Sequence, residues 1–148
     1  MKKLMLLSIA VLMISAAASA TVVTGAGGGI YGSGVTFNGV LLTGLRFGIG
    51  VDISSNGTSA GDFQSTLTSA AQEITIAGKS TAGSVSVGNT TFSGNCTVDM
   101  GNGTPLLQNV PFIATIGTDT NGKPAIALTI GATSLPAVNI TKGSTSIK

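Results

Sequence analysis

The sequence predicts an all-β protein: an antiparallel meander of about ten short strands, forming a single β-sandwich or flattened barrel. Three observations predict this fold. Thr, Val and Ile, which favour extended backbone, are abundant beyond residue 20. Apolar and polar residues alternate with period two in several segments. Four Asn-Gly dipeptides, which favour tight hairpin turns, separate the apolar runs: Asn38-Gly39, Asn56-Gly57, Asn102-Gly103 and Asn121-Gly122.

The first twenty residues have the pattern of a secretory signal peptide. Lys2 and Lys3 precede the apolar run Leu4–Ile14, and the small residues Ala18-Ser19-Ala20 fit a cleavage site. The apolar run is too short to span a bilayer comfortably. We therefore expect residues 1–20 to be removed and the mature protein to be secreted, extracellular or periplasmic. A retained N-terminal anchor is the alternative.

The mature chain is long enough for one domain and too short for two ordinary ones. Residues 21–34 form a Gly-rich segment with two interpretations. It is either a flexible leader or first strand, or an N-terminal arm that pairs with the sheet edge of another subunit. Residues 35–148 then form the single β domain.

Strands are expected in the following order along that domain. The clearest is Leu45–Ile53, where Leu45, Phe47, Ile49, Val51 and Ile53 share one face. The same alternation predicts strands over Phe92–Met100, Phe112–Ile116 and Ile126–Ile130. Shorter strands are expected over Val35–Phe37, Phe63–Leu67, Ile74–Ala77, Ser84–Val87, Val138–Thr141 and Thr145–Ile147.

A possible helical turn, glycines within strands and the positions of the prolines add detail to the predicted fold. Ser65–Glu73 is the one segment compatible with a short helical turn. Glycines within strands, at Gly48, Gly50 and Gly94, suit a coiled or bulged sheet and favour the sandwich-like or flattened form. Prolines fall where strands start or lie at an edge, at Pro105, Pro111, Pro124 and Pro136.

Charge is sparse and balanced once the signal is removed. Arg46, Lys79, Lys123, Lys142 and Lys148 stand against Asp52, Asp62, Glu73, Asp99 and Asp119, so the mature chain is formally neutral. This gives no basis for nucleic-acid binding. Low net charge weakens repulsion between copies and favours a protein that lives in a layer or matrix. The uncharged segment Pro124–Thr141 is the expected open edge for self-association.

Few residues of the sequence are candidates for catalysis. The chain has no His, which excludes catalytic triads and histidine-based zinc sites. Cys96 is the only cysteine and falls on the apolar face of a predicted strand, so we expect it to be buried and unreactive. Asp52 and Asp62 bracket one turn, and Asp99 and Asp119 bracket another pair of strands. Without aromatic platforms for a sugar, solvated or turn-capping carboxylates explain them better. We therefore expect no catalytic, cofactor-binding or metal-binding residues and no enzyme activity.

Three short motifs match known sites only in part. Asp119-Thr120-Asn121-Gly122 resembles the start of a calcium loop, but Ile130 stands where the final Glu belongs. Gly78-Lys79-Ser80 matches only the end of a phosphate-binding loop. Gly27, Gly29 and Gly32 have dinucleotide-binding spacing without the required strand and helix around them.

Several segments resemble small exported bacterial β-proteins of the post-COAP-1 type, whose role is largely uncharacterised. The matching pieces are Gly25–Gly29, Phe47–Val51, Thr91–Val98, Pro111–Ile116 with Asp119–Gly122, and Gly143–Ile147. The resemblance implies an exported β-domain and brings no catalytic residue. The chain is also similar in size and class to chaperone-assembled pilins, although the single Cys96 and the ending Ser144–Lys148 depart from that pattern.

The resulting expectation is an exported, non-catalytic β-domain protein, a structural or adhesive component of a cell surface or extracellular matrix. It would self-associate through sheet edges or the N-terminal arm, without stable membrane insertion after signal cleavage. The alternative is a soluble exported binding module for a small or polymeric ligand, and the minor alternative is a pilin-like subunit.

Overall fold

The computed structural model describes residues 20–148, so the predicted signal segment lies outside the described residues as far as residue 19. No helix occurs within residues 20–148, and so none that could cross a membrane. The strands are β1 (Thr21–Ile30), β2 (Thr36–Phe37), β3 (Val40–Ile53), β4 (Ser59–Ser69), β5 (Glu73–Ser86), β6 (Asn89–Asp99), β7 (Leu107–Thr118), β8 (Pro124–Ile130), β9 (Thr133–Ser134), β10 (Val138–Asn139) and β11 (Lys142–Ile147).

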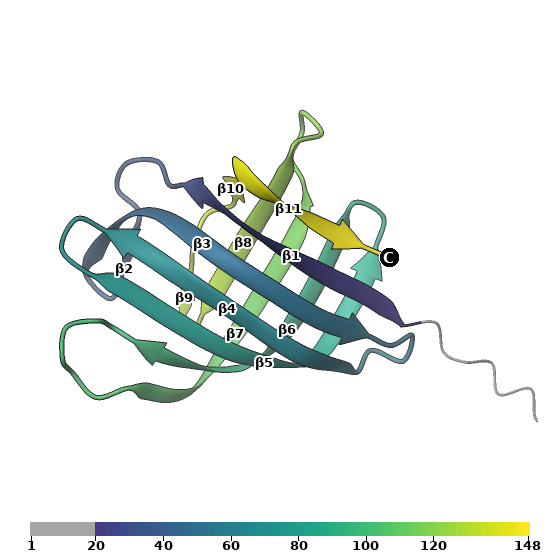
Figure 1. Cartoon of the computed structure of the whole chain (residues 1–148), viewed down its shortest axis with the longest axis horizontal. Helices are drawn as coiled ribbons and strands as arrows, with labels where there is room; N and C mark the ends of the chain where they lie inside the picture. Colours follow the sequence, from purple (N-terminus) through teal and green to yellow (C-terminus); the bar gives the residue numbers. More distant parts are fainter. Residues whose placement is uncertain (1–19) are drawn as a thin grey trace, which may run out of the picture.

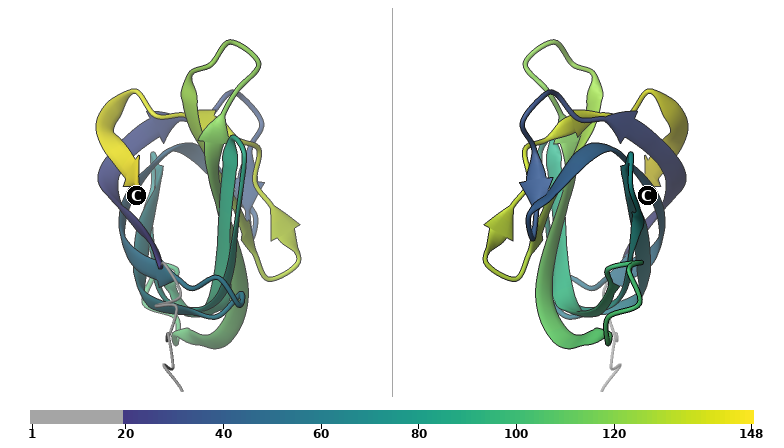
Figure 2. Two further views of the ribbon diagram at one scale, coloured as in Figure 1. Left: turned by 90° about the vertical axis from the view of Figure 1, so that its right-hand side faces the viewer. Right: turned by 90° about the vertical axis from the view of Figure 1, so that its left-hand side faces the viewer.

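All strand pairs are antiparallel and belong to one curled, half-barrel sheet (Figure 1), which confirms the predicted all-β, antiparallel class. The strand order is β10-β8-β7-β6-β5-β4-β3-β1-β11, with β2 beside β3 and β9 beside β8. Figure 2 shows the sheet curling so that its first strands face β6, β7 and β8. The helical turn considered over Ser65–Glu73 is wrong, because β4 continues to Ser69 and a tight turn leads directly into β5.

The core lies inside the curl and follows the predicted alternation. On β3 the side chains from Leu45 to Ile53 are buried at every second position. Three phenylalanines form its aromatic centre: the rings of Phe63 and Phe112 stack at 5.5 Å, and Phe92 meets Phe63 edge-on at 5.6 Å. Since these residues lie on β4, β6 and β7, the aromatic cluster joins the two sides of the curled sheet.

Turns are formed where the Asn-Gly dipeptides predicted them. Asn38 and Gly39 both have positive φ, 46° and 81°, which is the signature of a two-residue hairpin between β2 and β3. The other three dipeptides join β3 to β4, β6 to β7 and β7 to β8. The strands are longer than the apolar runs that predicted them, because Ser, Thr and Gly on the outer face continue the pairing without an apolar signal. β5 is the extreme case and contains a bulge between Ser80 and Ala82.

The Gly-rich segment Thr21–Ile30 forms β1, with β3 on one side and β11 on the other. Three alternate glycines face the C-terminal part of the chain. A Cβ at Gly25, Gly27 or Gly29 would collide with a backbone carbonyl oxygen, that of Ser144, Lys142 or Asn139 respectively. Glycine at these positions therefore allows the C-terminal segment to cross β1 at backbone contact distance.

The sheet edge differs from the one expected. Pro124–Thr141 was the expected open edge, but β8 is paired with β7 on one side and with β9 and β10 on the other. Its apolar residues Ile126, Leu128 and Ile130 are buried. The longer terminal strand of the sheet is β11, which pairs only with β1.

Candidate functional site

Of the carboxylates considered from the sequence, Asp52 and Asp62 are diagonal neighbours on the outer face of β3 and β4, because Asp62 pairs with Gly50 and Asp52 with Ala60. Asp99 and Asp119 lie in turns. Asp62 pairs with Lys79 across β4 and β5 at 3.1 Å, and both side chains are well exposed. Asp99 accepts a hydrogen bond from the Gly101 backbone N–H in a turn. Within residues 20–148 no group of three or more His, Cys, Asp or Glu side chains is placed to hold a metal ion.

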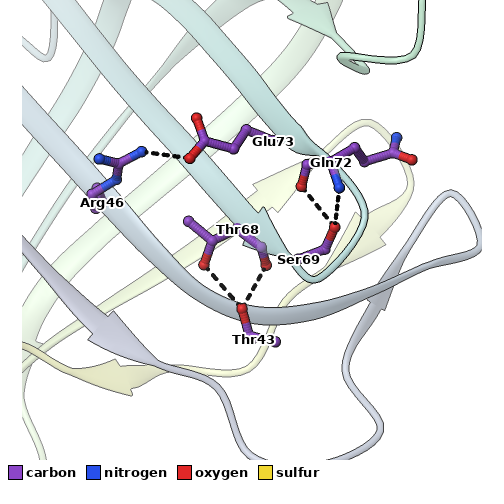
Figure 3. Close-up of polar contacts among 6 residues, drawn as sticks. All are labelled: Thr43, Arg46, Thr68, Ser69, Gln72 and Glu73. Carbon is purple, nitrogen blue, oxygen red and sulfur yellow. Dashed lines mark hydrogen bonds and ion pairs between the residues drawn. The ribbon is translucent and has the colours of Figure 1, made fainter.

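Glu73 belongs to a polar patch on the outer face of β3, β4 and β5, drawn in Figure 3. Its carboxylate lies 3.1 Å from the Arg46 guanidinium, and each side chain is 63% exposed. Nearby, the hydroxyls of Thr43 and Thr68 lie 3.2 Å apart. Exposed pairs of this kind contribute roughly 0–1 kcal/mol. The patch therefore ties neighbouring strands together and does not concentrate reactive groups.

Asp119 has a structural role in the β7–β8 turn. Its carboxylate accepts hydrogen bonds from the backbone N–H groups of Lys123 and Asn121 and from the Asn139 side chain. The Lys123 N–H is the main cause that holds the pKa of this carboxyl below its usual range. The segment that resembles a calcium loop is thus a turn whose carboxylate is already engaged by the protein.

Cys96 points into the core and is only 3% exposed. Burial raises the pKa of its thiol to about 11. Because the thiolate is the nucleophilic form, a buried thiol with a raised pKa is a poor nucleophile. Gly78-Lys79-Ser80 lies in the middle of β5 as extended backbone, and so does not form a phosphate-binding loop.

A groove of about 570 Å³ with a mixed polar and apolar lining crosses the outer face of β4, β5 and β6. Besides the Asp62–Lys79 pair it is lined by side-chain amides and hydroxyls, those of Gln64, Thr81, Asn95, Thr97 and Asn109. Asn109 lies where the β6–β7 register shifts and has a positive φ of 54°. We call this hollow the outer groove. It offers hydrogen-bonding groups, and the one aromatic residue in its lining, Phe63, is buried.

The free edge of β11 is the most distinctive site. Val22 and Lys148 exchange both backbone hydrogen bonds, at 2.7 and 3.0 Å. In an antiparallel pair such positions alternate with positions whose N–H and C=O groups point to the other side. Thr145 and Ile147 are at these alternate positions, so their backbone groups point away from β1. No further strand of residues 20–148 pairs with them.

An apolar pocket of about 280 Å³ lies beside this edge. We call it the edge pocket. Val85 of β5, Ile116 of β7 and Pro124 of β8 line it opposite Thr145 and Ile147. Val85 and Ile147 are 48% and 41% exposed. Thr145 and Ile147 pair with Gly25 and Val23, so their side chains share the inner face of the sheet. Thr145 and Ile147 therefore have backbone groups that point away from β1 and side chains that border the edge pocket.

The sequence predicts only a short strand over Thr145–Ile147 and an open edge over Pro124–Thr141. A local signal does exist: Lys142 and Lys148 bracket this strand, and lysines are common on the edge strands of sheets. The residues across the edge pocket come from β5, β7 and β8, and no local pattern brings them to the C-terminal strand.

No protein family, curated protein or solved structure matches this chain. The two features of this protein that bear on function are the outer groove and the β11 edge.

Proposed function

We propose that this chain is an exported, non-catalytic β-domain protein that serves as a structural or adhesive component of a cell surface or extracellular matrix. The observation that carries the proposal is the free edge of β11 beside the edge pocket. An unpaired edge is a ready template for an added strand, and an adjacent apolar pocket supplies side-chain affinity.

Export is supported by the pattern of residues 1–20 and by the position of the first strand. β1 begins at Thr21, so cleavage after Ala20 would leave every residue of that strand in place. Both sides of β1 are already paired, so self-association through an N-terminal arm would require β1 to leave the sheet. We therefore assign attachment to the β11 edge rather than to residues 21–34.

The proposed absence of catalysis is supported by the contacts of the carboxylates and of the Cys96 thiol. Asp62 pairs with Lys79, Glu73 pairs with Arg46, and the Asp119 carboxylate holds a turn. Cys96 is buried with a raised pKa. In these arrangements the candidate groups stabilise the sheet and its turns, and the one pair that shares a groove, Asp62 and Lys79, is well exposed to solvent.

We also propose that the sheet acts as a flattened barrel with one seam. Val138 and Asn139 pair with β8, and the same stretch of chain then pairs with β1 from Lys142 onward. By seam we mean the line along which β11 and β8 approach each other without pairing. The gap between them would lie beside Pro124, the first residue of β8, which is the position of the edge pocket. A pilin-like subunit would be a special case of this arrangement.

The test is retention at the cell surface. Thr145→Pro removes one outward N–H without touching the hydrogen bonds between β11 and β1. We expect the natural protein to stay in washed surface material and this variant to be released. Leu41→Ser, at an exposed apolar residue of β3, is the matched control and should be retained. Equal release of all three proteins would contradict the proposal.

The second candidate is a soluble exported binding module, and the outer groove favours it. Its amide and hydroxyl side chains could hold a polar ligand on the surface of β4–β6. Free diffusion of the natural protein in the extracellular fluid, as a stable monomer, would favour this alternative.

A further inference from the structure

The two faces of β11 carry different side chains. Alternate residues of this strand face opposite sides of the sheet. Lys142 and Lys148 pair with Gly28 and Val22, so they lie on the outer face. Thr145 and Ile147 lie on the inner face and border the edge pocket. A strand added here must match a cationic outer face and an apolar inner face.

The cations nearest the edge are Lys142 and Lys148, and Asp52 lies in the same outer-face row as Lys148, because both residues pair with Val22. Neither Lys142 nor Lys148 takes part in the two ion pairs found within residues 20–148. None of the residues lining the edge pocket is charged. Carboxylates on an added strand would lie opposite the two lysines. The row of Lys142 contains Gly28 and Arg46 and no carboxylate. An apolar side chain between the added carboxylates would enter the pocket.

The same charges argue against a second copy of β11 in this position. Two β11 strands paired antiparallel about Thr145 would place Lys142 of each copy opposite Lys148 of the other. Like charges directly opposite each other destabilise a strand pair. Lysines on an edge are a common device against such self-pairing.

We propose that the β11 edge binds an extended segment of another protein, in which acidic residues flank alternating apolar residues. The segment would add as a strand to β11, with an aliphatic side chain in the edge pocket and carboxylates beside Lys142 and Lys148. This inference rests on the proposed adhesive function and names the chemistry of its partner.

The test uses a capped peptide, Glu-Val-Thr-Val-Thr-Val-Glu, titrated against the purified protein. Amide resonances of Thr145 and Ile147 should shift, because their N–H groups gain acceptors. The matched peptide Lys-Val-Thr-Val-Thr-Val-Lys should bind about fivefold or more weakly, and high salt should remove most of that difference.

Two variants separate the contributions of backbone and charge. Thr145→Pro should weaken binding of the acidic peptide about tenfold. Because a proline can disturb β11 itself, Lys142→Glu gives an independent test: it should reverse the preference in favour of the lysine peptide. Leu41→Glu adds a negative charge at an exposed residue of β3, outside the edge pocket and the outer groove, and should leave the preference unchanged.

Equal binding of the two peptides, or no resonance shift at about 1 mM peptide, would overturn the inference. Self-association that Thr145→Pro abolishes, with the peptide inert, would also overturn it and would identify the occupant as a second copy. In either case retention of the protein at the cell surface would leave the proposed function standing. Loss of surface retention with peptide binding intact would instead contradict the proposed function.

Discussion

The ring of Phe112 lies directly over the bare α-carbon of Gly78: a Cβ built at that glycine would come within 2.6 Å of the ring. Gly78 faces the core from β5, opposite the stacked pair of Phe63 and Phe112. A side chain at this position would force the aromatic cluster apart. The absence of a side chain at Gly78 is therefore part of the core packing.

We expect Gly78→Ala to destabilise the protein by about 1–3 kcal/mol through overpacking. Chemical denaturation of the two proteins measures the difference. Gly48→Ala is the matched control, since a Cβ at that strand position meets nothing within 4 Å. That variant should be neutral or slightly more stable, because alanine restricts the unfolded chain. Equal losses from both substitutions would contradict the packing role of Gly78.

A second prediction concerns the crossing of β1 by the C-terminal segment. Gly27→Ala places a methyl group against the backbone carbonyl of Lys142, which cannot move without displacing β11. Amide hydrogen exchange in β11 should become much faster while exchange in the core strands stays slow. Gly50→Ala, on the open outer face of β3, should leave exchange in β11 unchanged. Unchanged protection of β11 in Gly27→Ala would show that the close approach is not required.

A third prediction concerns the thiol of Cys96. It should react slowly with a thiol reagent until the protein is denatured, because it is buried.

The pKa of the Cys96 thiol in the folded protein is about 11, above its ordinary value of 9.0. The thiol therefore contributes stability fully below about pH 9, and that contribution is lost as the pH rises toward 11. Cys96→Ala should show a smaller loss of stability between pH 9 and 11. Identical pH profiles would contradict this assignment.

A fourth prediction concerns Tyr31, which follows β1. Its hydroxyl is buried and finds no hydrogen-bond partner within residues 20–148, and burial raises its pKa. A buried hydroxyl without a partner costs roughly 1–3 kcal/mol. Tyr31→Phe should therefore raise the denaturation midpoint. A lower midpoint would mean that the hydroxyl has a partner, such as a bound water.

The sequence patterns predicted local features of this fold well. Alternation identified Leu45–Ile53 because each inward residue of β3 is large and apolar. The Asn-Gly dipeptides located the turns because their backbone requirements are local. Strand lengths were underestimated where the outer face carries Ser, Thr and Gly, as in β5. The helical turn over Ser65–Glu73 was wrong because this stretch of β4 alternates as a strand: Thr66 and Thr68 face outward, while the buried Ser65 hydroxyl donates to the Arg46 carbonyl of β3.

The candidate site could not be predicted in the same way. An edge is defined by which strands lack neighbours, and this depends on the order of all strands in the sheet. The uncharged run Ile126–Ile130 suggested an open edge, yet β9 and β10 cover it from further along the chain. The β11 edge depends on its crossing of β1 and on residues from β5, β7 and β8. Only the bracketing lysines were visible in the sequence.

The most direct test of the account is the intact mass of the protein released from washed surface material of the producing cells. We predict a chain that begins at Thr21, held there until the material is disrupted, with the Thr145→Pro variant missing from the same fraction. A chain that still carries Met1–Ala20, or a mature chain found only free in the surrounding fluid, would contradict the proposal of an exported protein fixed to its surroundings through β11.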